Sequence, residues 1–291
     1  MSEKNINQKA MDTLAHQDWD GAQRLFREAC ATYNGYRSYN NLGIYYIHEN
    51  VICKNSKIIN GRALGKRWLK KSLSVKETPK ALNNLALIEY ETDHLSEAYT
   101  YWERAYQLTH DPNTSYNIAA TLFRMGAYAQ AAERARDRSL PEAKQLYVCA
   151  LCMNDPAHSL AMIRQGTLSL DVVDEHDAMY LYHKMNQYDD VIRIAEEFDK
   201  HNIGLNDNQV LLLWNSYIQS GRKDEGIACI KQRYVEGYDP SYARSLWRQL
   251  LKFSRDPMYR AQILEKCLIY PQPYAPECEF FGCPMHGTPW D

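Results

Sequence analysis

No stretch of this 291-residue sequence is apolar over the roughly 20 consecutive residues that a membrane-spanning helix needs. The N-terminal segment, residues 1–7, is polar and lacks the apolar core of a secretory signal. Without an export signal, the eight cysteines are expected to be thiols or metal ligands, because disulfides form mainly in exported proteins. These absences predict a cytoplasmic protein.

The sequence also lacks the motifs of several common enzyme classes. It has no glycine-rich phosphate loop, no His-Glu-x-x-His motif and no Gly-x-Ser-x-Gly motif. Its formal net charge is only −2, so the field of the whole molecule favours neither nucleic acid nor an anionic membrane. We therefore expect a protein that is not an enzyme.

The sequence does contain a repeated pattern of paired helices. Between Pro79 and Pro112, apolar residues follow helical spacing on either side of a polar break at 91–94. The first stripe is Leu82, Leu85, Ala86 and Tyr90, and the second is Leu95, Ala98, Trp102 and Ala105. Small residues in both stripes allow the helices to approach closely, and the prolines separate this hairpin from its neighbours.

This unit resembles a tetratricopeptide repeat (TPR), a helical hairpin of about 34 residues, and related patterns recur over residues 8–270. The second copy is longer, through an insertion around Glu49–Gly61, and it also resembles a Sel1-like repeat. The resemblance implies an all-α fold: a right-handed superhelical solenoid of about eight antiparallel helical hairpins. The first helix of each hairpin is then expected to line a concave groove.

The pattern divides the chain into three segments. We predict an N-terminal tail over residues 1–8, a TPR-like array over 9–270, and a C-terminal tail rich in proline and cysteine over 271–291. Within the array, the better-matched repeats span 9–138 and the degenerate repeats span 139–270.

Three asparagines share one position in successive first helices. Asn41, Asn84 and Asn117 each precede a Leu or Ile expected to be buried, in segments that align without gaps. The resemblance to peptide-binding TPR proteins implies that these amides grip the main chain of an extended ligand, since a carboxamide both donates and accepts hydrogen bonds. Neighbouring residues that suit an acidic side chain or a carboxylate are Arg37, Asn40, Lys80, Asn83 and Arg124.

An alternative interpretation is that these asparagines only form hydrogen bonds between repeats. The pattern of TPRs that clamp the C-terminal carboxylate of chaperones is incomplete, because Ile44 stands where that clamp needs a second asparagine. If the ladder binds peptide, replacing two of its asparagines should weaken binding about tenfold and leave the melting temperature nearly unchanged.

A basic helix is expected around residues 62–73. Its charged side carries Lys66, Arg67, Lys70 and Lys71. A solvated helix face explains this patch without any ligand, and an acidic partner or RNA is the alternative. The sequence has no exposed aromatic residues interleaved with the patch and no known RNA fold, so nucleic acid is not the expected partner.

The C-terminal tail contains Cys278, Cys283 and His286, whose side chains are of the kinds that zinc prefers. A closed zinc site needs four ligands, and Cys267, His201 or Glu277 would have to supply the fourth. Alternatively, the tail is a strap whose aromatic residues cover the outer face of the last hairpin. Those aromatic residues are Phe280, Phe281 and Trp290.

Together these features predict a non-catalytic scaffold or adaptor that binds an extended peptide or a partner protein in the concave groove. We expect no cofactor apart from the zinc considered above. Two alternatives remain open: a regulatory TPR protein that responds to a peptide or another ligand, and an accessory subunit of an enzyme that uses the Cys/His tail to bind metal.

Overall fold

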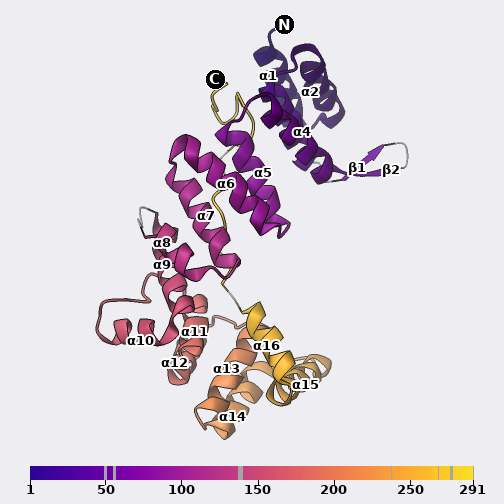
Figure 1. Cartoon of the computed structure of the whole chain (residues 1–291). Coiled ribbons are helices and arrows are strands. Elements are labelled where there is room, and N and C mark those ends of the chain that lie inside the picture. Colours follow the sequence, from indigo (N-terminus) through magenta and orange to yellow (C-terminus); the bar gives the residue numbers. More distant parts are fainter. Residues whose placement is uncertain are drawn as a thin grey trace. The chain divides into compact units, whose positions relative to one another are not determined.

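A computed structural model describes residues 1–48, 51–54, 57–136, 140–236, 238–267, 269–275 and 278–290. The chain forms two compact units (Figure 1). The first unit is Met1–Ala127 together with Gln272–Asp291, and the second is Tyr128–Pro271. The C-terminal tail therefore belongs to the unit that contains the first repeats.

Sixteen helices occur in the described residues, and they follow one another as eight consecutive pairs. The first unit contains α1 (Glu3–Ala15), α2 (Trp19–Tyr33), α3 (Tyr36–His48), α4 (Gly61–Val75), α5 (Pro79–Glu91), α6 (Leu95–Thr109) and α7 (Pro112–Arg124). The second contains α8 (Tyr128–Arg134), α9 (Pro141–Asn154), α10 (Pro156–Arg164), α11 (Glu175–Lys184), α12 (Tyr188–Lys200), α13 (Asp207–Gln219), α14 (Lys223–Tyr234), α15 (Pro240–Arg255) and α16 (Pro257–Lys266). The predicted series of about eight helical hairpins is confirmed.

Capping residues explain where the first helices begin. Before α5, the Thr78 hydroxyl accepts the Ala81 N–H, and before α7 an Asp111 carboxylate oxygen accepts the Thr114 N–H at 2.8 Å. Each cap is followed by a proline, whose fixed φ suits the first helical turn and whose missing N–H costs nothing there. The sequence thus sets the start of these two hairpins locally.

Five of the turns between paired helices share one backbone geometry. In each turn a residue adopts a left-handed conformation, with φ between 58° and 77°, and the next residue donates its N–H to the carbonyl five positions earlier. This arrangement ends a helix while satisfying its last carbonyls. The left-handed residues are Gln17, Asp93, Gly126, Asn186 and Gly221.

Small residues let the paired helices approach closely, as the sequence predicts. In the α5–α6 pair, Trp102 is fully buried and its ring lies 5.5 Å from that of Tyr90. Between α3 and α4 the backbones come closer still, because a Cβ added to Gly65 would lie 2.6 Å from the Gly43 carbonyl oxygen. Each such interface buries an apolar face that a single hairpin would leave exposed.

One local expectation is wrong. Residues 3–8 are helical instead of forming a tail, because the Ser2 hydroxyl accepts the Asn5 N–H and caps α1. The insertion between α3 and α4, for which the sequence pattern predicts no structure, contains a two-stranded antiparallel hairpin, β1 (Val51–Lys54) and β2 (Lys57–Asn60). The division of the array at residue 138 into better-matched and degenerate repeats stays a prediction.

Across the described part of the chain, every helix is too short or too polar to pass through a membrane.

Candidate functional site

The candidate site is the face of the first unit that α3, α5 and α7 share, and the chain's own C-terminal tail lies along it (Figure 1). These are the first helices of their hairpins, which the sequence predicts as the lining of the groove. In Figure 1 the tail is the yellow segment that runs beside these helices. Five prolines between 271 and 289 favour an extended backbone, whose peptide groups are free to bond side chains.

Two asparagines of the predicted ladder each form hydrogen bonds with both the N–H and the carbonyl of one tail residue. Asn117 donates from Nδ2 to the Tyr274 carbonyl at 3.0 Å, and its Oδ1 accepts the Tyr274 N–H at 2.7 Å. Asn41 forms the same pair of bonds with Phe281, at 3.1 Å and 2.8 Å. Such a pair recognises the main chain without contacting the side chain of the bound residue.

The tail between these two residues is also held by its carbonyl groups. The Glu279 carbonyl accepts hydrogen bonds from Asn40 Nδ2 at 3.0 Å and from Asn84 Nδ2 at 3.1 Å. Lys80 Nζ donates to the Cys278 carbonyl at 2.9 Å. All three members of the ladder, with Asn40 and Lys80 from the predicted surroundings, therefore contact one extended segment.

The same amides also connect neighbouring helices. Asn84 Nδ2 donates to Asn40 Oδ1 at 3.0 Å, and Asn41 Nδ2 donates to Asn7 Oδ1 at 3.2 Å. Hydrogen bonding between repeats therefore coexists with hydrogen bonding to the tail. Because Asn41 and Asn84 are buried within this network, their replacement is expected to destabilise the first unit as well, which changes the expectation of an unaltered melting temperature.

Aromatic and charged side chains of the tail occupy adjacent positions on the first unit. The Phe280 ring stacks on Phe26 at 5.9 Å, and the Phe281 ring meets Tyr36 edge-on at 5.8 Å. Glu279 pairs with His48 on α3 at 2.8 Å, and this hydrogen bond raises the pKa of His48. Burial lowers the pKa of Lys80.

The prediction that the tail covers the last hairpin is wrong. Phe280 and Phe281 pack on the first unit, and the Trp290 ring lies 5.4 Å from the guanidinium of Arg37 on α3. The physical reason is the row of amides on α3, α5 and α7, which offers the tail partners for its peptide groups. Glu277, considered above as a zinc ligand, lies outside the described residues.

Other predicted site residues are used differently. Arg124 bonds the Tyr90 carbonyl at 3.0 Å and Asp93 at 2.8 Å, which ties α7 to the preceding hairpin. Asn83 is partly buried on α5, and within the described residues its Oδ1 has no hydrogen-bond partner.

Two of the four residues of the basic patch contact other side chains of the first unit. Lys66 pairs with the buried carboxylate of Glu89 at 2.7 Å, and the Lys71 ammonium lies 4.2 Å from the centre of the Tyr39 ring. The remaining members, Arg67 and Lys70, are exposed on α4. A ligand for this patch stays untested.

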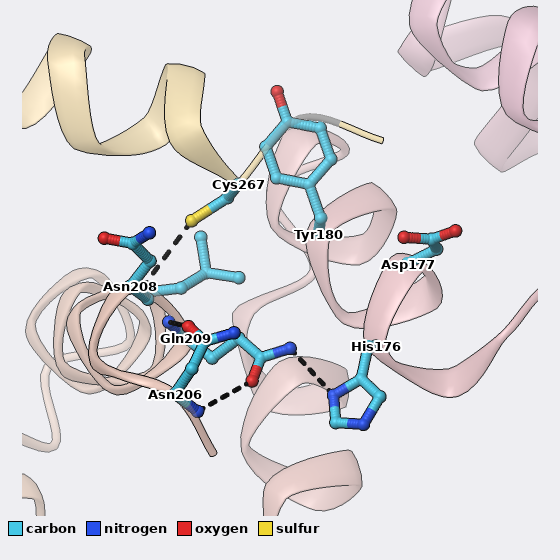
Figure 2. A pocket seen from close by; sticks show the side chains of 8 residues that line it. His176, Asp177, Tyr180, Asn206, Asn208, Gln209 and Cys267 are labelled. Atoms are coloured by element: carbon cyan, nitrogen blue, oxygen red, sulfur yellow. Dashed lines mark hydrogen bonds between the residues drawn. The ribbon is translucent and has the colours of Figure 1, made fainter. Parts of the chain in front are cut away.

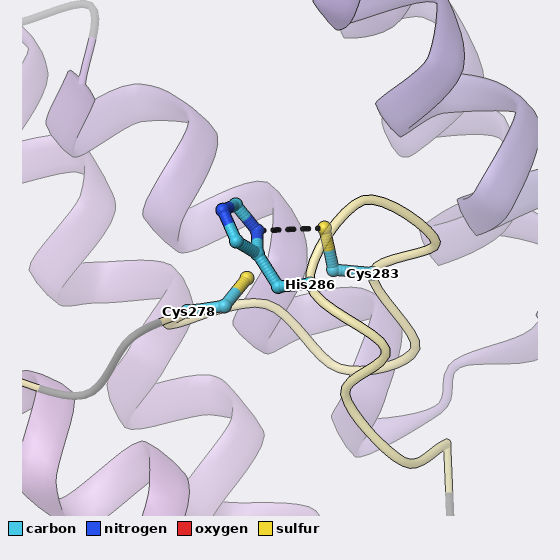
Figure 3. Close-up of side chains that lie close together, drawn as sticks. All are labelled: Cys278, Cys283 and His286. Carbon is cyan, nitrogen blue, oxygen red and sulfur yellow. Dashed lines mark hydrogen bonds between the residues drawn. The ribbon is translucent and has the colours of Figure 1, made fainter.

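The tail also brings together Cys278, Cys283 and His286, the predicted metal ligands (Figure 3). Their ligand atoms all lie within 4.8 Å of one another, and Cys283 Sγ is 3.3 Å from His286 Nδ1. Both cysteines are buried, whereas the histidine is exposed. We refer to these three residues as the tail cluster.

A separate hollow lies within the second unit (Figure 2). Its wall includes Cys267, whose thiol contacts the Asn208 carbonyl at 3.6 Å and whose pKa burial raises to about 11. His176 Nδ1 is bonded to Gln209 Nε2 at 2.7 Å, and burial raises the pKa of Asp177 to about 6. A protonated thiol is a poor nucleophile, so the described wall of this hollow offers no activated cysteine.

Sequence reasoning missed two parts of the site. One is the occupant of the groove, although the proline-rich composition of the tail already indicated an extended segment. The other is the extension of the amide network to α1, where Asn7 Nδ2 bonds the Ser38 hydroxyl at 2.9 Å. Asn7 falls in the segment predicted as a tail, so no helical phase was assigned to it.

Comparisons with known proteins identify the fold. No protein-family model matches the sequence, and no curated protein matches it. The crystal structure of a tetratricopeptide repeat protein from Parabacteroides merdae is 13% identical with a TM-score of 0.56, and the alignment covers 86% of this chain and 98% of that one. At this identity the similarity establishes the fold alone, which is that of TPR proteins.

Two further solved structures align with lower TM-scores. PilF of Pseudomonas aeruginosa is 17% identical with a TM-score of 0.43, covering 85% of this chain and 97% of that one. A chain of the Naa15/Naa10 complex bound to HypK is 13% identical with a TM-score of 0.46. That alignment covers 91% of this chain and 44% of the other.

Proposed function

We propose that this chain, which has the fold of TPR proteins, is a non-catalytic interaction scaffold whose first unit binds an extended polypeptide. The binding surface is the asparagine ladder Asn41, Asn84 and Asn117 together with Asn40 and Lys80. The observation that carries the proposal is the tail itself, because its main chain receives hydrogen bonds from all five of these side chains.

The tail also indicates which partner segment the groove accepts. Its central sequence is an acidic residue followed by two phenylalanines, Glu279–Phe281. The acidic residue pairs with His48, and Phe281 lies 5.6 Å from the ammonium of Lys80. A partner with an acidic residue next to a pair of aromatic residues therefore fits the same positions. Such a partner competes with the tail for one set of amides, so binding requires displacement of the tail.

The proposal can be tested in the full-length chain by making the tail cleavable. A recognition sequence for a site-specific protease is inserted after Pro271, at the boundary of the tail, and a dye is attached at the C-terminus. After cleavage the tail is held only by non-covalent contacts, so its anisotropy reports retention or release. We expect retention, followed by displacement when an unlabelled peptide with the sequence of residues 272–290 is added in excess.

Variants identify the surface that holds the tail. Asn117→Ala removes two hydrogen bonds to Tyr274, worth about 2 kcal/mol in total, and should therefore weaken retention about 30-fold. Asn83→Ala is the control: Asn83 is next to Asn84 on α5, its Oδ1 has no hydrogen-bond partner within the described residues, and its replacement should leave retention unchanged. Immediate release of the cleaved tail from the unmodified chain, or equal retention in both variants, would contradict the proposal.

A further inference from the structure

The three ligand atoms of the tail cluster are separated by distances close to those between the ligands of a metal ion. A tetrahedral zinc ion with bonds of about 2.3 Å to sulfur and 2.0 Å to nitrogen separates its ligand atoms by about 3.5–3.8 Å. The observed separation of Cys283 Sγ and His286 Nδ1 is 3.3 Å, and no pair in the cluster exceeds 4.8 Å. In Figure 3 the thiols of Cys278 and Cys283 both lie next to the His286 ring, and the dashed line joins the Cys283 thiol to it. Small side-chain rotations are enough to enclose an ion.

Two of the three ligands, Cys283 and His286, lie on a loop that hydrogen bonds close. Gly282 and Gly287 adopt left-handed conformations, with φ of 65° and 60°, which turn the chain before Cys283 and after His286. The loop is closed because the Cys283 N–H donates to the Thr288 hydroxyl at 2.7 Å and the Thr288 N–H donates to the Cys283 carbonyl at 3.2 Å. Ligands on a closed loop lose little conformational entropy when they bind a metal.

Ligand chemistry selects the kind of metal. Two thiolates and an imidazole are soft or borderline donors, which favour zinc over calcium or magnesium, since the latter ions require oxygen ligands. A [4Fe–4S] centre normally takes four cysteines, whereas the tail cluster contains only two. The two thiolates balance the charge of one divalent ion, so the ion and its thiolate ligands carry no net charge together.

We infer that Cys278, Cys283 and His286 bind one zinc ion, with the fourth coordination position open on the exposed side of His286. Solvent or a side chain from a partner supplies that ligand. Cys267 and His201 both belong to the second unit, where the Cys267 thiol already contacts the Asn208 carbonyl. The site is independent of the proposed function, because it requires only the tail and not an external peptide.

The site explains why the tail presents its phenylalanines in a fixed geometry. Phe280 and Phe281 lie between the two cysteines in sequence, so a metal bound to both cysteines closes the loop that carries these rings. The rings then meet Phe26 and Tyr36 without further ordering of the loop. Zinc thus lowers the entropic cost of docking this part of the tail.

The test is metal analysis of the reduced full-length chain, followed by replacement of zinc with cobalt(II). We expect one zinc ion per chain, and a cobalt derivative with thiolate-to-metal charge-transfer absorption and the visible bands of a tetrahedral site. Both signals should disappear in the Cys278→Ser/Cys283→Ser variant. Cys229→Ser and Cys267→Ser replace two partly buried cysteines outside the tail cluster, and these control variants should keep one zinc ion per chain.

Circular dichroism separates loss of the metal from loss of the fold, since the helices lie outside the tail and should persist in the double variant. His286→Ala keeps both thiols and should weaken zinc binding and alter the cobalt spectrum. The inference is overturned if the folded, reduced chain binds no zinc at micromolar concentration, or if stoichiometric copper or iron occupies the cluster instead. It is equally overturned if the double variant retains its zinc, or if thiol counting finds a Cys278–Cys283 disulfide in protein purified under reducing conditions.

Discussion

The asparagine ladder makes its sharpest prediction at Asn117. Both hydrogen bonds that the described residues provide for its side-chain amide go to Tyr274, whereas Asn41 and Asn84 also bond neighbouring helices. Asn117→Ala therefore weakens docking of the tail without removing a contact between repeats. Each bond contributes on the order of 1 kcal/mol, so the docking equilibrium around Tyr274 should fall about 30-fold.

Hydrogen exchange measured by mass spectrometry can detect this change in the uncleaved chain. The Tyr274 N–H is protected by Asn117 Oδ1, and exchange requires that contact to open. Amides around Tyr274 should exchange about 30-fold faster in Asn117→Ala, while those of α3 and α5 keep their wild-type rates. Asn83→Ala serves as the control. Equal protection of the tail in the two variants would refute the assignment of these hydrogen bonds.

Three further predictions concern the stability of the two units. Burial lowers the pKa of His183 from 6.5 to about 4, so the second unit becomes less stable as the pH falls below 6.5. In urea unfolding, its free energy of unfolding should fall by about 3 kcal/mol between pH 7 and pH 4, relative to the change in the His183→Gln variant. Gly65→Ala places a Cβ 2.6 Å from the Gly43 carbonyl oxygen and should cost about 1–3 kcal/mol, whereas Gly204→Ala, with open space around it, should cost little. Trp102→Ala empties a fully buried site and should destabilise the first unit by about 3–5 kcal/mol, and a thermal midpoint within error of the wild type would contradict the packing described here.

The helical hairpins were predictable because their signals are local. The apolar spacing between Pro79 and Pro112, with the Thr78 cap and Pro79 at the start of α5, determines α5 and α6 with little help from distant parts of the chain. The β1–β2 hairpin had a local signal too, since Val51, Ile52, Ile58 and Ile59 favour strands, but the repeat pattern identified only an insertion there and predicted no structure for it.

The ladder was predictable for the same reason, and its occupant was not. The common phase of Asn41, Asn84 and Asn117 is visible in the sequence because each repeat presents it in the same local context. Their contacts with the tail join residues 157 to 240 positions apart, and no periodicity encodes such a pairing. The tail was placed on the last hairpin because no further repeat covers the outer apolar face of that hairpin, although an extended chain can reach about 3.3 Å further with every residue.

The tail cluster could be predicted only in part. The side-chain types of Cys278, Cys283 and His286 and their nearness in the sequence identified three candidate ligands, and the structure brings their ligand atoms together. The two glycine turns that achieve this depend on backbone conformation at Gly282 and Gly287, which a search for zinc-finger spacing does not reveal.

Recognition of the peptide main chain by the ladder is tested most directly by competition in the cleaved chain. Two synthetic peptides with the sequence of residues 272–290 differ only in an N-methyl group on Tyr274, which removes the N–H that Asn117 Oδ1 accepts at 2.7 Å. The unmodified peptide should displace the labelled tail at a concentration about tenfold lower than the methylated peptide, in keeping with the loss of one buried hydrogen bond. Equal displacement by the two peptides would show that the groove does not bind this segment by its backbone.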